Sequence, residues 1–190
     1  MPGVILALLL AGQQPVVPDV ALEDQFEQVR DVKQLRGHVV VLIYGDRRST
    51  DANRALGEQI HVAFHPSAKG QPPAQARQAT VVPVAGAPPG AATPDVVTVP
   101  VALVGKVPPL VRKLLRGQFK SGSPDVPVWL DFGDVMKTRF PFTAGVPNVV
   151  VLDTKGQYRY AAAGTPTADG MKRLLGTIES LRREAVAPAK

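Results

Sequence analysis

The residues with the greatest capacity for chemistry lie in one charged turn, Asp46–Asp51. The turn follows seven residues, Val39–Gly45, whose apolar character predicts a buried strand. Apolar residues at helical spacing then run from Ala52 to Phe64 and predict a helix. In open α/β folds, the connection between a strand and the next helix lies at the carboxyl end of the sheet, where ligands bind. The turn is therefore the first place to look for a functional site.

Ser49 could act as a nucleophile only with a general base close by. The histidines are poorly placed for this role. His38 precedes the buried strand, at the end opposite the turn, and His61 and His65 lie about 15 Å or more along the helix. We therefore expect no Ser-His-Asp set and no other catalytic residue. The preferred interpretation is a cap on the following helix, supplied by Ser49, Thr50 or Asp51.

Arg47 and Arg48 could form an anion site, because they flank a helix amino terminus, where backbone N–H groups attract anions. Asp46 and Asp51 would partly neutralise the two guanidinium groups. We therefore favour a solvated turn with an internal Arg–Asp pair over a site for phosphate, sulfate or carboxylate.

Neither a metal site nor a specific nucleic-acid surface is predicted. His61 and His65 are four residues apart and share a helix face, but no third ligand completes the set. One predicted helix has a basic face, formed by Arg112, Lys113, Arg116 and Lys120. No aromatic platform accompanies it on which nucleic-acid bases could stack. The formal net charge of +6 therefore indicates a basic solvated surface, and no cofactor is expected.

Length and composition indicate one globular domain. The chain has 190 residues, of which 45% are hydrophobic and 20% charged, enough for an ordinary core. It contains no cysteine, which excludes disulfides, thiolate metal sites and thiol redox chemistry for this chain.

The first residues resemble an export signal. Val4–Gly12 is an apolar run too short to span a bilayer, and its small last residues would suit cleavage. No basic residue precedes the run, so an N-terminal helix or strand packed on the domain is the alternative. We expect residues 1–14 to be a signal or N-terminal segment. The protein would then be periplasmic or secreted, and cytoplasmic if the run is no signal. No other stretch approaches transmembrane length.

Residues 15–185 are expected to form a single domain, with a Pro/Gly-rich insertion at about 67–107 and a disordered tail at 186–190. Within the insertion, Val81–Val84 predicts a short strand. Val96–Val104 is interrupted by Pro100 and predicts an edge element.

A helix is predicted from Pro108 onward, with Arg112, Lys113 and Arg116 on its solvent face. Its expected core-facing residues are Leu110, Val111, Leu114 and Leu115.

The second half of the chain alternates strands and helices. Strands are predicted at Val126–Asp131 and Val146–Asp153, and a closing helix at Thr167–Glu184. The turn Thr154–Gln157 leads into an antiparallel partner, Tyr158–Ala161. The earlier connections are helical and imply parallel neighbours. The fold class is therefore α/β, with a mixed central sheet between two helical layers.

Three segments of this pattern resemble the thioredoxin-like fold, in its branch of peroxiredoxins and thiol-disulfide oxidoreductases. They are Leu35–Leu42, Val128–Asp131 and Gly145–Gln157, and the resemblance covers roughly Pro18–Arg183 apart from the insertion. In that family the proline of the third segment is cis and faces the redox turn. The resemblance therefore implies a cis Val146–Pro147 bond close to Ser49–Asp51.

The resemblance fails at the chemistry of that family. The thioredoxin-type register places the two cysteine positions at Ser49 and Ala52. The peroxiredoxin register instead matches its motif to Asp46, Thr50 and Asn53, of which only the threonine agrees. A further likeness is to small exported YtfJ-like bacterial proteins, which also lack these cysteines. It is carried by Gly45–Thr50 and Val150–Gly156.

These observations predict a cysteine-less, redox-inactive module that binds a protein or peptide, or serves a structural role, in the bacterial cell envelope. The resemblance implies that an extended segment of the partner would pair beside Pro147. The candidate groove consists of Arg47, Arg48, Ser49, Thr50, Asp51, Val146 and Pro147. The alternative is a redoxin-family oxidoreductase by descent, with antioxidant or thiol-disulfide exchange activity, that needs a thiol from a partner. The partner and the oligomeric state are left open.

Overall fold

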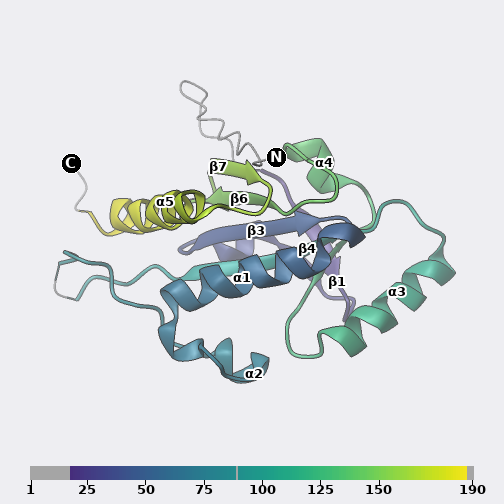
Figure 1. Cartoon of the computed structure of the whole chain (residues 1–190), viewed down its shortest axis with the longest axis horizontal. Coiled ribbons are helices and arrows are strands. Elements are labelled where there is room, and N and C mark those ends of the chain that lie inside the picture. The colour runs from purple at the N-terminus through teal and green to yellow at the C-terminus, as the bar shows by residue number, and fades with distance from the viewer. Residues whose placement is uncertain (1–17, 89, 188–190) are drawn as a thin grey trace.

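The computed structural model describes residues 18–88 and 90–187 and is built on a seven-stranded sheet (Figure 1). The predicted signal segment 1–14 lies outside the described residues. The strands are β1 (Ala21–Asp24), β2 (Val29–Asp31), β3 (Val39–Gly45), β4 (Val96–Leu103), β5 (Trp129–Asp131), β6 (Asn148–Leu152) and β7 (Tyr158–Ala163). The helices are α1 (Thr50–Phe64), α2 (Pro73–Ala76), α3 (Pro109–Gly122), α4 (Val135–Arg139) and α5 (Ala168–Val186). Short 3-10 turns are formed by Val32–Leu35, Arg47–Ser49 and Pro66–Ala68.

The sheet is mixed, as predicted, and its strand order is β2-β1-β5-β4-β3-β6-β7. The helical connections through α1 and α3 make β3, β4 and β5 parallel neighbours. The turn at Lys155–Gly156 makes β6 and β7 antiparallel. At the other edge, β1 pairs antiparallel with β5 and β2. This arrangement confirms the predicted fold class.

Strand β3 is the centre of the core, because all seven of its residues are buried. Alternate side chains point to opposite faces of the sheet. Val39, Val41 and Ile43 pack against α1 and α5, and Val40, Leu42 and Tyr44 pack on the other face, where α4 and the turn Val32–Leu35 lie. This burial on both faces is what the continuous Val/Leu/Ile run in the sequence indicates.

Strand β4 is a central strand, so the prediction of an edge element there was wrong. Pro100 lies opposite Ile43 of β3, whereas β5 pairs only with Val101–Leu103. The proline, which has no N–H to donate, thus precedes the part of β4 that has strands on both sides. Segment 67–107 contributes a strand of the sheet as well as loops.

Val81–Val84 forms no strand, contrary to the sequence prediction. The backbone groups of Val82 are used differently: its N–H donates to the carbonyl of Phe64, and its carbonyl accepts from the guanidinium of Arg182. Arg182 is fully buried on α5 and also donates to the carbonyl of Pro94, at 3.0 Å. The buried guanidinium of Arg182 thus supplies a hydrogen bond to this segment that a neighbouring strand would supply in a sheet.

Helix α3 is rotated relative to the sequence prediction. Leu110 and Leu114 point to solvent, at 80% and 63% exposed, while the guanidinium groups of Arg112 and Arg116 lie over the ring of Phe132. The expected inward leucine face was therefore wrong for most of its residues. The physical reason for this orientation is the ring of Phe132, whose face attracts the guanidinium groups of Arg112 and Arg116 and so turns that side of the helix inward.

At the carboxyl end, α5 continues to Val186, the first residue of the predicted tail 186–190, and residues 188–190 lie outside the described part. Among the described residues, no helix is both long and apolar enough to cross a bilayer.

Candidate functional site

The charged turn follows Gly45, the last residue of β3, where any larger residue would clash with its neighbours. A Cβ on Gly45 would lie 2.0 Å from Oγ of Ser49 and 2.8 Å from Nδ2 of Asn53. The absence of a side chain at position 45 thus lets the start of α1 lie close against the end of β3. The glycine thus fixes how the turn leaves the sheet.

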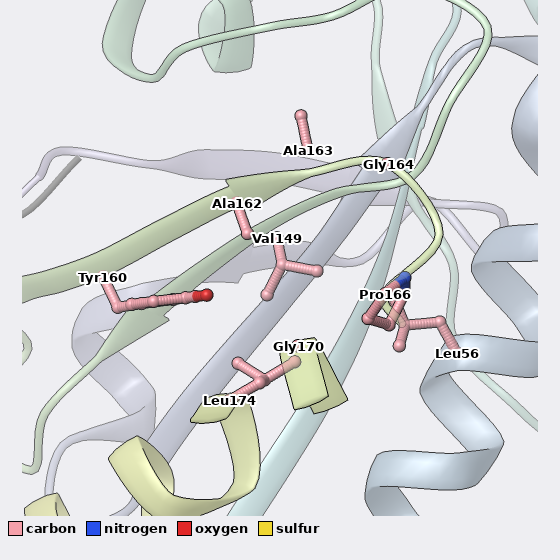
Figure 2. Close-up of a pocket in the computed structure, with 9 residues that line it drawn as sticks. All are labelled: Leu56, Val149, Tyr160, Ala162, Ala163, Gly164, Pro166, Gly170 and Leu174. Carbon is pink, nitrogen blue, oxygen red and sulfur yellow. The ribbon is translucent and has the colours of Figure 1, made fainter. Parts of the chain in front are cut away.

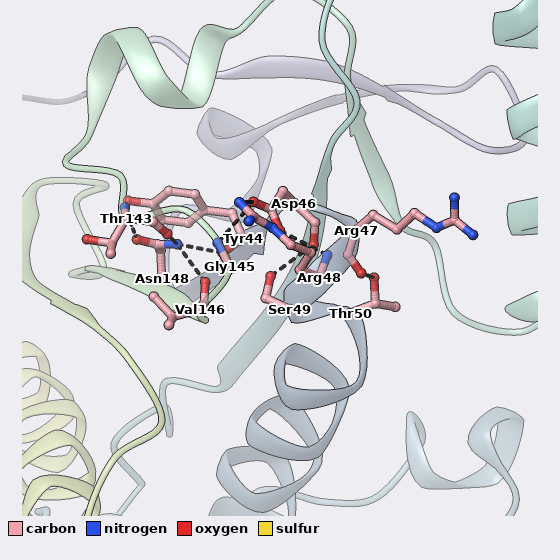
Figure 3. A network of polar contacts seen from close by, with 10 residues as sticks. All are labelled: Tyr44, Asp46, Arg47, Arg48, Ser49, Thr50, Thr143, Gly145, Val146 and Asn148. Carbon is pink, nitrogen blue, oxygen red and sulfur yellow. Dashed lines mark hydrogen bonds and ion pairs between the residues drawn. The ribbon is translucent and has the colours of Figure 1, made fainter. Parts of the chain in front are cut away.

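Asp46 joins this turn to a loop 99 residues later in the chain (Figure 3). One carboxylate oxygen, Oδ1, accepts from the backbone N–H of Arg48 at 2.9 Å. The other, Oδ2, accepts from the N–H of Gly145 at 2.9 Å and from Nη2 of Arg48 at 3.1 Å. The internal Arg–Asp pair predicted for this turn is therefore present, between Arg48 and Asp46.

These donors determine the electrostatics of Asp46. Partial burial acts to raise the pKa of its carboxyl group, but the hydrogen bonds from Arg48 and Gly145 outweigh burial and lower that pKa below its ordinary value. The carboxylate form is thus favoured in the folded protein.

The hydroxyl groups of the turn are used locally. Ser49 is buried, and its Oγ donates to the carbonyl of Asp46 at 3.0 Å. Thr50 Oγ1 donates to the carbonyl of Arg47 at 2.9 Å. Ser49 occupies the cap position of α1 but makes no capping hydrogen bond with its side chain, so the predicted Ser49 cap was wrong. Asp46 instead caps the 3-10 turn before the helix.

The facing loop is held by Asn148, the first residue of β6, which is 1% exposed. Its Nδ2 donates to the carbonyls of Thr143 and Val146, both at 2.9 Å, and its Oδ1 accepts from the N–H of Thr143 at 2.8 Å. Figure 3 shows this amide between the loop and Tyr44 of β3. One buried side chain thus fixes the loop that carries Val146 and Pro147.

Tyr44 supports the same loop from β3. Its hydroxyl donates to the carbonyl of Pro141. Burial raises the pKa of Tyr44 well above its ordinary value. The phenol therefore remains protonated and acts as a donor.

The bond between Val146 and Pro147 is trans, since the described residues contain no cis peptide bond. The cis geometry implied by the resemblance was wrong. The loop nevertheless lies beside the turn. A Cβ on Gly145, whose φ is +76°, would lie 3.6 Å from the guanidinium carbon of Arg48. A side chain at position 145 would thus first meet that of Arg48, two residues after Asp46.

The predicted binding residues differ in accessibility. Ser49 and Pro147 are buried and Val146 is half-buried. The exposed members of the set are Arg47, Arg48, Thr50 and Asp51. The surface available to a partner therefore consists chiefly of charged and hydroxyl side chains.

The histidines lie at the opposite end of the sheet. His65, at the carboxyl end of α1, contacts Asp95, which immediately precedes β4, with 2.7 Å between Nε2 and Oδ1. The rings of His61 and His65 stack with their centroids 4.2 Å apart. In the described ranges, no group of three or more potential ligands is placed to hold a metal ion. No histidine thus serves Ser49 as a base.

A small apolar recess lies between α1, α5 and the strands β6 and β7 (Figure 2). Leu56, Val149 and Leu174 point into it, and Tyr160 and Pro166 border it. No charged residue lines the recess, and its lining is apolar apart from the hydroxyl of Tyr160, so it offers chiefly hydrophobic contact.

Two residues of this arrangement were missed by sequence reasoning as functional elements. Asp46 was treated as a neutralising charge, and Asn148 as part of a strand. A signal existed for Asn148, because it is the one amide side chain at the head of the apolar run Val149–Leu152. Buried polar groups require hydrogen-bond partners, so such a residue predicts a local network.

No family model matches the chain, and no curated protein matches it. Several solved structures are similar to it. A secreted thiol-disulfide isomerase from Corynebacterium glutamicum has a TM-score of 0.56 at 11% identity, and the match covers 92% of each chain. An exposed lipoprotein thioredoxin from Streptococcus pneumoniae has a TM-score of 0.51 at 13% identity, covering 84% of this chain and 98% of its own. A DsbF homologue from Corynebacterium diphtheriae has a TM-score of 0.52 at 10% identity, covering 90% and 92%.

Identities this low establish the fold rather than the activity. The mixed seven-stranded sheet with its helices is consistent with the thioredoxin-like fold of these neighbours. The chain therefore has the thioredoxin-like fold and contains no cysteine with which to perform thiol chemistry.

Proposed function

We propose that this chain is a redox-inactive thioredoxin-like binding module that holds an extended segment of a partner protein at its charged turn. The observation that supports this most is the hydrogen bond from the N–H of Gly145 to the carboxylate of Asp46. It joins the charged turn to the loop that carries Val146 and Pro147, so the two segments can act as one surface. Arg47, Thr50 and Asp51 are exposed on it, whereas Ser49 and Pro147 are buried.

The mode of binding follows from the side chains of the turn. Because the Val146–Pro147 bond is trans, and the carbonyl of Val146 already accepts from Asn148, strand addition at this loop is not the main contact. The guanidinium groups of Arg47 and Arg48 instead favour a partner segment that carries carboxylates and backbone acceptors. The hydroxyl of Thr50 already donates to the carbonyl of Arg47 and is left to accept a hydrogen bond from the partner.

The location proposed is the bacterial cell envelope or the exterior, as for YtfJ-like exported proteins. Two features support it: the apolar run Val4–Gly12, and structural neighbours described as a secreted isomerase and an exposed lipoprotein.

Site-specific photo-crosslinking tests this proposal. A photoreactive amino acid at Thr50 should give a discrete cross-linked protein in the native envelope fraction. The same amino acid at Glu58, an exposed residue further along α1, should give none. The product should weaken in Arg47→Glu/Arg48→Glu and persist in Arg54→Glu/Lys69→Glu, which changes the net charge equally. Equal products at both positions, or none at Thr50, would refute the proposed surface.

The oxidoreductase alternative is separated by activity. The purified chain should neither reduce insulin disulfides nor consume peroxide, because it supplies no thiolate. Clear turnover by the pure protein would overturn the binding-module proposal.

A further inference from the structure

Helix α3 presents an apolar face that no described residue covers. Leu110, Val111 and Leu114 are all exposed, and no residue of the helix is fully buried. Figure 1 shows α3 at the margin of the molecule, beside the end of the sheet that holds β1. A helix of 14 residues therefore turns its leucines outward.

The orientation of α3 is fixed by its arginines. The guanidinium carbons of Arg112 and Arg116 lie 5.1 and 5.3 Å from the centroid of the Phe132 ring. Arg116 also donates to the carboxylate of Glu23 on β1, and its side chain is only 15% exposed. These contacts hold one side of the helix against the body, so the exposed leucines are a fixed feature of the surface.

Neighbouring residues extend this apolar surface. Within residues 18–88 and 90–187, the large hydrophobic side chains that are exposed lie either on α3 or on the hairpin of β1 and β2. The hairpin contributes Phe26 and Val29. Val29 pairs with Glu23, the residue that binds Arg116, so the two groups belong to the same end of the molecule.

The charges on the helix indicate what would cover it. Helix α3 contains four basic residues and no acidic one. Lys113 and Lys120 are exposed and make no ion pair with a described residue, and Lys106 is exposed just before the helix. Glu23 and Glu27, acidic residues of the adjoining hairpin, are paired with Arg116. Two copies of α3 brought face to face would therefore place their lysines against one another. A protruding pair of leucines with lysines beside them is instead suited to an anionic interface.

We propose that α3 docks on an anionic lipid surface, with Leu110 and Leu114 inserted among the acyl chains and Lys113 and Lys120 at the headgroups. The proposed contact uses none of the residues Asp46–Asp51, so it would tether the module to a membrane through different side chains from those assigned to the partner.

Flotation of the full chain with lipid vesicles tests this inference. Binding is expected to vesicles of 30% phosphatidylglycerol in phosphatidylcholine, to exceed that to phosphatidylcholine alone, and to fall with added salt. Lys113→Gln/Lys120→Gln should weaken binding roughly 10- to 30-fold. Lys69→Gln/Lys155→Gln removes the same charge from exposed positions elsewhere and should leave binding unchanged. Because every variant keeps residues 1–12, differences between variants report on α3.

The leucines are tested in the same assay. Leu110→Ser/Leu114→Ser should weaken binding about tenfold or more. Its unfolding midpoint should match that of the parent, because both side chains are exposed. Equal effects of the two lysine pairs, or no preference for anionic vesicles, would overturn the inference. So would a concentration-dependent dimer, or binding to an acidic protein without lipid, that is abolished by the leucine changes. Unchanged Thr50 cross-linking in these variants would keep this outcome separate from the proposed function.

Discussion

The carboxylate of Asp46 accepts a hydrogen bond from the backbone N–H of Gly145, with 2.9 Å between the heavy atoms. Arg48, which donates twice to the same carboxylate, lies against Gly145. The turn after β3 and the loop before β6 are therefore one structural unit. A substitution in either segment is therefore expected to disturb the other.

Removing the Asp46 carboxylate should loosen this unit. Asp46→Ala leaves the N–H groups of Gly145 and Arg48 without their acceptor, and we expect a loss of about 1 kcal/mol in the free energy of unfolding. Urea denaturation measures this value. Glu58→Ala, at an exposed position in the middle of α1, should change it by less than about 0.5 kcal/mol. A loss for Asp46→Ala no larger than that control would show that the bridge contributes little.

Gly45 tests how closely α1 is drawn against β3. Because a Cβ would lie 2.0 Å from Oγ of Ser49, Gly45→Ala should lower the unfolding free energy by about 2 kcal/mol or more. A Cβ on Gly176 of α5 would meet nothing within 4 Å outside its own helix backbone, so Gly176→Ala should instead stabilise by roughly 0.5–1 kcal/mol. The opposite signs in thermal unfolding are the check. Tolerance of alanine at position 45 would mean that the turn can move away from the strand.

The sequence allowed the prediction of elements whose signal is local. Strand β3 and the hairpin of β6 and β7 follow from short apolar runs and turn residues, and the sheet direction follows from the helical connections. The position of the charged turn at the end of β3 followed in the same way. These features need no knowledge of distant partners.

The features that were mispredicted depend on partners far away in the chain. The inward side of α3 is decided by Phe132, and Val82 is bound by Arg182, 100 residues later. Strand β4 is central because β5, which follows α3, pairs with its last three residues, Val101–Leu103. Within the site, the bridge from Asp46 to Gly145 spans 99 residues and has no local pattern.

The contact between His65 and Asp95 should make the free energy of unfolding depend on pH in the acid range. The hydrogen bond from His65 is the main cause that lowers the pKa of Asp95 below its ordinary 3.8, with burial opposing and further help from the N–H of Val96 and from His38. A carboxyl group with a lowered folded-state pKa contributes stability above its unfolded pKa, and that contribution is lost as pH falls through the folded value.

We therefore expect Asp95→Asn to be less stable than the parent at pH 7, with the difference shrinking below about pH 4. Urea denaturation at a series of pH values measures this. Asp125→Asn, whose side chain accepts no hydrogen bond from a described residue, is the control and should show a constant difference. A difference for Asp95→Asn that does not change with pH would contradict the assignment.

Introduced cysteines can establish which residues occupy the redox position of the fold. Sequence reasoning pointed to Ser49 and Ala52, but Ser49 is buried and its Oγ is bound to the carbonyl of Asp46, whereas the exposed Arg48 lies against Gly145. A thiol at a helix amino terminus is activated only where it is also accessible. We therefore expect Arg48→Cys/Asp51→Cys, at exposed positions three residues apart, to gain insulin-reducing activity. Ser49→Cys/Ala52→Cys should react at least about tenfold more slowly with a disulfide reagent, because the first thiol is buried. The reverse order of rates would restore the register predicted from the sequence. Inactivity of both pairs, in variants that still unfold cooperatively, would show that this turn does not occupy the redox position.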